Sequence, residues 1–122
     1  FQMADEIKAQ FGEEIGKLQQ LEKDHENYVR IRHKLVRELA ENKLIKEGMD
    51  VHGDDAVVYK QIGRTFIPQD TIETRTNVDT RIEAISDGMK RVDSALEGFG
   101  SKQSAQKDKI VALQQKFKKM AS

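Results

Sequence analysis

Residues 57–68 read VVYKQIGRTFIP, and this stretch decides the fold because β-branched and aromatic residues crowd there between two long, charge-rich segments. Residues 57–62 have strand composition, and residues 65–67 return as a second strand. Gly63 supplies the positive φ that the two-residue turn Gly63-Arg64 needs. The stretch therefore predicts a β-hairpin. Because an isolated two-stranded hairpin is marginally stable in water, its apolar side chains need partners.

The segment before the hairpin has the spacing of a long amphipathic helix. Residues 3–49 contain no proline, and apolar residues recur at steps of three and four. Two successive steps of three, from Ile15 through Leu18 to Leu21, predict a local irregularity in the seam, the apolar stripe that faces the other helix. Gly48 is the expected C-terminal cap, because turn-forming residues follow it. Those residues are Asp50, His52, Gly53, Asp54 and Asp55.

The segment after the hairpin has a more regular seam. Pro68 cannot donate to a strand ladder and is expected to close the second strand, and residues 70–73 (DTIE) have the form of a capping box. From Val78 to Met120 the seam positions alternate steps of four and three, which predicts a left-handed coiled coil. Its polar seam positions are Gln103 and Gln106, and a flexible point is expected beside them at Gly98 and Gly100.

These elements predict a mainly α fold, a long antiparallel two-helix coiled coil joined by a single β-hairpin. We expect one domain over residues 1–122, with helices at 1–50 and 70–121 and the hairpin at 56–68. Folding the chain back at the hairpin places Phe11 beside Ile110, Ile7 near Leu113, His25 near Leu96 and Leu39 near Ile82.

Composition supports a thin seam and excludes several classes of function. The chain is 37% hydrophobic and 34% charged, which suits two largely solvent-exposed helices better than a globular core. Lys plus Arg equals Asp plus Glu at 21 each, so no overall field favours nucleic acid or a membrane surface. There is no cysteine, no window approaches the ~20 apolar residues of a membrane span, and no signal-peptide pattern opens the sequence.

No residues form a catalytic, cofactor or metal site, so we expect no enzyme. Glu22-x-x-His25 is half of a di-iron motif, but no second copy exists, and His25 is better interpreted as a seam residue. His33 and His52 stand alone. The Asp residues near the hairpin lack the spacing of a calcium loop, and no phosphate loop or nucleophile with a base is present.

Two sets of apolar residues remain as candidate binding sites. The hairpin set is expected to hold an oligomer together, and it comprises Val57, Val58, Tyr59, Ile62, Gly63, Phe66 and Ile67. The second set gathers where the two helix ends meet, and it comprises Met3, Ile7, Phe11, Ile110, Leu113, Phe117 and Met120. Methionine adapts to irregular apolar surfaces, so the second set suits loose binding of varied partners.

The sequence resembles the β-type prefoldin subunits. The resemblance rests on ENKLIKE at 41–47, VYKQIG at 58–63, QD at 69–70 and NVDTRIE at 77–83, and it extends over nearly the whole chain. Arg64-Thr65 and the pair Gly98 and Gly100 depart from the family pattern.

The resemblance implies a cytoplasmic heterohexamer in which this chain joins two α-type and three further β-type subunits through a β-barrel of hairpins. It also implies an ATP-independent co-chaperone whose helix ends capture unfolded actin and tubulin and deliver them to the cytosolic group II chaperonin. The second set would then contact these client proteins.

Two other classes of function stay open from the residues alone. The heptads equally suit a coiled-coil tether or scaffold without chaperone activity. A tRNA-binding helical arm would carry a basic stripe and a helical bend, whereas this chain has balanced charge and a strand-like bend.

Overall fold

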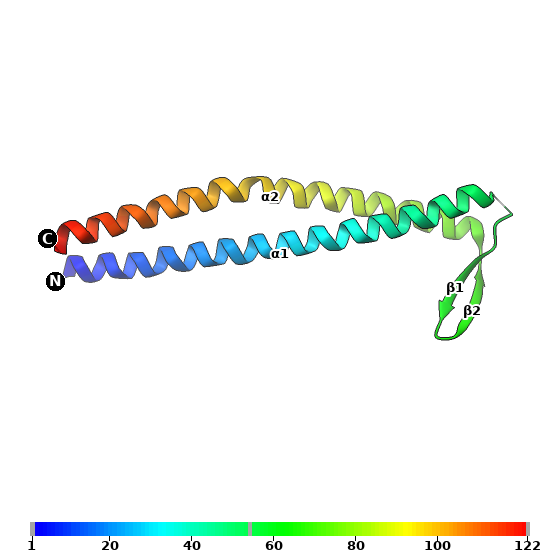
Figure 1. Ribbon diagram of the computed structural model, residues 1–122, viewed down its shortest axis with the longest axis horizontal. Coiled ribbons are helices and arrows are strands. Elements are labelled where there is room, and N and C mark those ends of the chain that lie inside the picture. Colours follow the sequence, from blue (N-terminus) through cyan, green and yellow to red (C-terminus); the bar gives the residue numbers. More distant parts are fainter. Residues whose placement is uncertain (1, 54, 122) are drawn as a thin grey trace. The chain divides into compact units, whose positions relative to one another are not determined.

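The computed structural model describes residues 2–53 and 55–121, so the predicted turn residue Asp54 lies outside the described residues. In chain order it contains helix α1 (Gln2–His52), strand β1 (Val58–Ile62), strand β2 (Thr65–Gln69) and helix α2 (Thr71–Ala121) (Figure 1). Two long helices joined by one antiparallel hairpin confirm the predicted fold class. The chain divides into two compact units, residues 1–31 with 92–122, and residues 32–91.

The first unit joins the start of α1 to the end of α2, and the two chain ends lie side by side in it (Figure 1). Its buried apolar residues are Ile7, Val92, Phe99 and Ile110. The Phe99 ring meets the rings of His25 and Tyr28, with centroids 5.4 and 5.6 Å away. His25 therefore occupies the seam as predicted, and its ring contacts that of Phe99, three residues beyond the Leu96 expected.

The predicted irregularity in the first seam is wrong. Glu14 occupies the seam position, because the buried Gln106 side chain donates from Nε2 to the Glu14 backbone oxygen at 2.8 Å and to its carboxylate. With Glu14 included, α1 alternates steps of four and three from Ile7 through Phe11 to Leu18. A polar residue at a seam position hides an unbroken heptad from an apolar count, and such pairs help to fix helix register.

The second unit holds the end of α1, the hairpin and the start of α2. Met49, Val78 and Ile85 are buried in its seam. Gly88 permits a close approach of the helices, since a Cβ there would lie 3.5 Å from the Leu35 side chain.

Polar contacts between α1 and α2 continue the seam of this unit toward the hairpin. Lys46 Nζ lies 2.9 Å from Asp79 Oδ1, and Arg75 pairs with Asp50 while donating to the Met49 backbone oxygen at 3.2 Å. These contacts hold the last turn of α1 in place.

Helix α1 ends later than the sequence predicts, because Gly53 and not Gly48 is its C-terminal cap. Gly53 has φ 72° and its N–H donates to the Met49 oxygen at 3.0 Å, which is the left-handed cap. Gly48 lies in the helix, because burial of Met49 and pairing of Asp50 with Arg75 stabilise one further turn.

The hairpin has the predicted two-residue turn. Ile62 pairs with Thr65 across Gly63-Arg64, Gly63 has φ 62°, and Arg64 does not have a positive φ, which is the pattern of a type II′ turn. At the other end, the Asp70 carboxylate accepts a hydrogen bond from the Glu73 N–H at 2.9 Å, so the predicted N-cap of α2 is confirmed.

The prediction that Pro68 closes the second strand is wrong, because β2 continues to Gln69. The pair next to the turn, Ile62 and Thr65, is hydrogen-bonded, and the pairs alternate along the ladder, so Tyr59 and Pro68 form a non-hydrogen-bonded pair. The backbone N–H of a residue in such a pair points away from the partner strand. The missing donor of Pro68 therefore falls on the open edge, where a strand tolerates proline.

Candidate functional sites

The hairpin presents apolar side chains on both of its faces. Paired residues share a face, so Tyr59, Phe66 and Pro68 lie on one side of the ladder. Ile62 and Ile67 lie on the other side, where Val58 is half-buried. A two-stranded hairpin is marginally stable alone, so its apolar faces need partners.

Exposure of the predicted hairpin set agrees with that need. Phe66 is 63% exposed and Tyr59 is 56% exposed, although aromatic rings are normally among the best-buried groups. Val57, Ile62 and Ile67 are also exposed. Thr71 Oγ1 donates to the Ala56 oxygen at 2.6 Å and ties the entry of the hairpin to the start of α2.

Three apolar residues of the same unit were missed by the sequence interpretation. Leu44 and Val51 in α1, and Ile72 in α2, are 70%, 81% and 79% exposed. They lie off the seam, and the sequence signal was present as apolar residues outside the heptad positions. We regard them as further candidates for contact with a neighbouring subunit.

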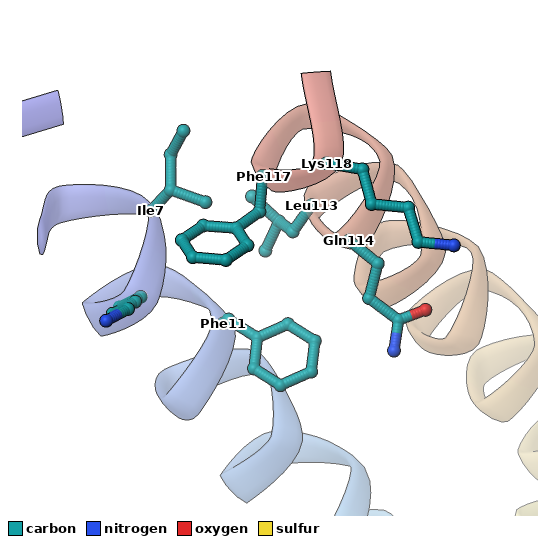
Figure 2. A pocket seen from close by; sticks show the side chains of 7 residues that line it. Ile7, Phe11, Leu113, Gln114, Phe117 and Lys118 are labelled. Carbon is teal, nitrogen blue, oxygen red and sulfur yellow. The ribbon is translucent and has the colours of Figure 1, made fainter. Parts of the chain in front are cut away.

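The helix ends of the first unit form an apolar groove of about 410 Å³, named here the lysine-flanked groove. Figure 2 shows Ile7 and Phe11 directed from α1, and Leu113 and Phe117 from α2, toward one space, with Gln114 and Lys118 on its α2 side. Lys8 completes the lining, and its Nζ lies 5.7 Å from the centre of the Phe117 ring. The groove is therefore apolar inside and cationic at its margins.

The predicted client set is divided among three positions. Four of its members line the lysine-flanked groove, namely Ile7, Phe11, Leu113 and Phe117. Met3 and Met120 line a second hollow of about 350 Å³ with Glu6 and Lys119. Ile110 is 7% exposed and lines neither, so it supports the helix pair from within the seam. Contact of this set with clients stays a prediction.

A third hollow, named here the glutamate-flanked groove, has a volume of about 400 Å³. Its lining is Gln10, Glu13, Glu14, Lys109, Ala112, Leu113 and Lys116. Glu14 and Leu113 are seam residues, and the other side chains of this lining directly precede seam positions. Lys8, Gln114 and Lys118 directly follow seam positions, so the two grooves lie on opposite sides of the seam. The sequence interpretation missed this division, because the side of a lysine is defined only once the helices are paired.

Charge is balanced on the glutamate-flanked side. The Gln106 amide, which donates to Glu14, holds the pKa of that carboxyl below its usual 4.5, and burial acts in the opposite direction. Lys17 and Lys109 lower the pKa further. The carboxylate thus stays ionised beside lysines that neutralise it.

Two other kinds of site are absent from the part of the chain that the structure describes. No group of three or more His, Asp or Glu side chains could hold a metal ion. Neither described helix is apolar enough over a sufficient length to cross a membrane.

Comparisons with known proteins place the chain in a family. The Prefoldin_2 family of prefoldin subunits matches residues 12–117, and the chain belongs to the prefoldin family. Among its relatives, the chain is 39% identical over 119 residues to probable prefoldin subunit 6 of Caenorhabditis elegans, covering 98% of this chain and 93% of that protein. It is 32% identical over 117 residues to prefoldin subunit 6 of Homo sapiens, covering 96% and 91%.

A solved structure supports the fold independently. The crystal structure of the prefoldin beta subunit from Thermococcus strain KS-1 matches with a TM-score of 0.68, covering 84% of this chain and 90% of that chain at 20% identity. The resemblance to prefoldin subunits inferred from residues 41–83 is confirmed.

Proposed function

We propose that this chain is one subunit of a hexameric prefoldin co-chaperone, assembled with two α-type and three further β-type subunits. The observation that carries the proposal is a hairpin with exposed apolar side chains on both faces, in a chain of the prefoldin family. Full burial of an aromatic or branched side chain contributes ~1.5–3 kcal/mol. Covering Tyr59, Phe66, Ile62 and Ile67 in a β-barrel of hairpins would supply a large part of the assembly free energy.

The second part of the proposal concerns what the assembly binds. The lysine-flanked groove offers apolar side chains from two helices, and the exposed Met3 and Met120 lie beyond it. Methionine and lysine side chains rearrange easily, so such a surface suits unfolded segments of varied sequence. Binding of this kind needs no nucleotide, cofactor or chemical step, and the chain is proposed to act as an ATP-independent holdase and not as an enzyme.

The family resemblance extends the proposal to particular partners. Unfolded actin and tubulin are the proposed clients, the cytosolic group II chaperonin is the proposed recipient, and the cytoplasm is the proposed location. No nucleic acid or membrane takes part.

The test uses the assembled complex and a chemically denatured protein that aggregates on dilution. Light scattering without ATP is compared for wild type, a Phe11→Gln/Phe117→Gln variant and the control Val36→Gln, which alters an exposed apolar residue of α1 outside the groove. We expect the groove variant to lose most suppression of aggregation, while the control keeps it and all three retain the same native mass.

A tether or scaffold without chaperone activity predicts a different result. In that case wild type would assemble but fail to suppress aggregation, and the groove variant would behave like wild type. Either outcome would exclude the proposed binding of clients at the helix ends.

A further inference from the structure

We propose that the lysine-flanked groove selects client segments that carry carboxylate side chains next to their apolar ones. The inference rests on the proposed function and names the class of segment that this groove would take. The main evidence for this inference is the lining of the groove, which combines four apolar side chains with Lys8 and Lys118 and contains no carboxylate.

The two lysines lie where a bound segment would meet them. Lys8 projects from α1 and its Nζ stands 5.7 Å from the centre of the Phe117 ring, so the ammonium lies over a ring that lines the groove. Lys118 follows Phe117 in α2, and Figure 2 shows it on the α2 side of the same space. A segment that buries apolar side chains against Phe11 and Phe117 would pass between two cations.

The opposite side of the seam shows why this charge is available to a ligand. The glutamate-flanked groove places Lys109 and Lys116 on α2 beside Glu13 and Glu14 on α1, so its lysines already face carboxylates of the same chain. No acidic residue occupies the corresponding positions in the lysine-flanked groove, and Asp5, one turn before Lys8, is not part of its lining. Of the two grooves that flank the seam here, the lysine-flanked groove is the one whose own lining leaves positive charge unbalanced.

This difference in charge between the two grooves should make the lysine-flanked groove selective for acidic segments. Charges around an apolar site contribute mainly to specificity and capture, and like charges are rejected. Pairs at an exposed margin contribute modestly, so two lysines together should favour an acidic segment over a neutral one by about fivefold in affinity. The preference should disappear near 1 M salt, where the Debye length is about 3 Å.

The test reads occupancy of this groove within the assembled complex. A photo-crosslinking residue replaces Gln114, which lines the groove without carrying charge. The probes are three short fluorescein-labelled peptides with Leu and Phe at the same positions and Glu, Gln or Lys between them. We expect crosslinking to follow the order Glu, then Gln, then Lys, with about a fivefold difference in half-saturating concentration between the first two.

Charge reversals supply the matched control. Lys8→Glu/Lys118→Glu should remove or invert the preference, whereas Lys109→Glu/Lys116→Glu makes the same change in net charge in the glutamate-flanked groove and should retain it. Equal crosslinking of the three peptides, or equal effects of the two double variants, would overturn the inference while leaving chaperone binding intact. Absence of any crosslink, together with unchanged aggregation, would instead overturn the proposed function.

Discussion

The hairpin and the lysine-flanked groove both expose apolar side chains, but the chain holds them in different ways. The hairpin fixes Tyr59 and Phe66 on a backbone ladder whose entry is tied by Thr71 to Ala56. The groove draws on side chains from two helices, among them the long and adaptable Lys8 and Lys118. A rigid surface suits one permanent partner, whereas an adaptable surface suits many transient ones. The difference supports the proposal that the hairpin mediates assembly and that the helix ends bind clients.

The largest expected effect is a loss of subunit affinity in the variant Tyr59→Ser/Phe66→Ser. Each substitution removes at least ~1.5 kcal/mol of buried apolar contact in an assembled hairpin, so subunit affinity should fall by about 100-fold or more. Native mass spectrometry should show free chain, while circular dichroism shows unchanged helix content because both side chains are exposed in the free chain. Lys60→Gln, in the same strand, should assemble normally, and an intact double-variant hexamer would show that the joint lies elsewhere.

A smaller effect on the hairpin side is expected from Asp70→Ala. The carboxylate caps α2 through the Glu73 N–H, and loss of such a cap costs about 1 kcal/mol. Thermal unfolding followed by circular dichroism should show a lower midpoint. Asp70→Asn retains an acceptor oxygen and should keep most of the stability, so equal losses in the two variants would argue against capping.

On the groove side, Gly100→Ala should stabilise α2 by up to about 1 kcal/mol. Gly100 is exposed within the helix, and an added Cβ meets nothing within 4 Å. Gly63→Ala provides a control of opposite sign, since φ 62° strains a residue with a side chain although the space is equally open. The two midpoints should move apart in thermal unfolding. A lower midpoint for Gly100→Ala would mean that the glycine is needed for the path of the helix.

The smallest expected effect is the pH dependence from Glu14. Gln106 lowers the pKa of Glu14 in the folded chain, so the unfolded chain binds the proton more tightly. The stabilisation is therefore present above the usual pKa of 4.5 and is lost as pH falls through the lower folded value. The midpoint difference between wild type and Glu14→Gln should shrink between neutral pH and about pH 3. A difference that stays constant would show that ionisation of Glu14 does not contribute.

Local chemistry made much of the fold predictable. Gly63 can adopt the positive φ that the turn requires, and Asp70 needs only the N–H three residues later, so the turn and the cap followed from short stretches. The end of α1 could not be predicted from a short stretch of sequence. Gly48 has the composition of a cap, but the helix continues because Met49 is buried by α2 and Asp50 pairs with Arg75, and such contacts are invisible until the helices are paired.

The candidate site was predictable in part for the same reason. Apolar periodicity located Phe11 and Phe117 at one end of the helix pair, where they line the groove. It could not assign Lys8 and Lys118 to one side of the seam, and balanced totals of charge concealed a local imbalance. Glu14 was missed because its partner Gln106 lies 92 residues away.

Pro68 has a consequence for the chain before it meets its partners. The outward-facing positions of β1 are Tyr59 and Gln61, which keep both their donors and their acceptors, whereas those of β2 are Phe66 and Pro68, and the latter has no N–H to offer. A sheet that grows into a fibril adds strands at both of its edges, and the β2 edge lacks one backbone donor at Pro68. The β2 edge is therefore a poorer template for a further strand than the β1 edge, which is one of the ways in which exposed strand edges are kept from indiscriminate pairing.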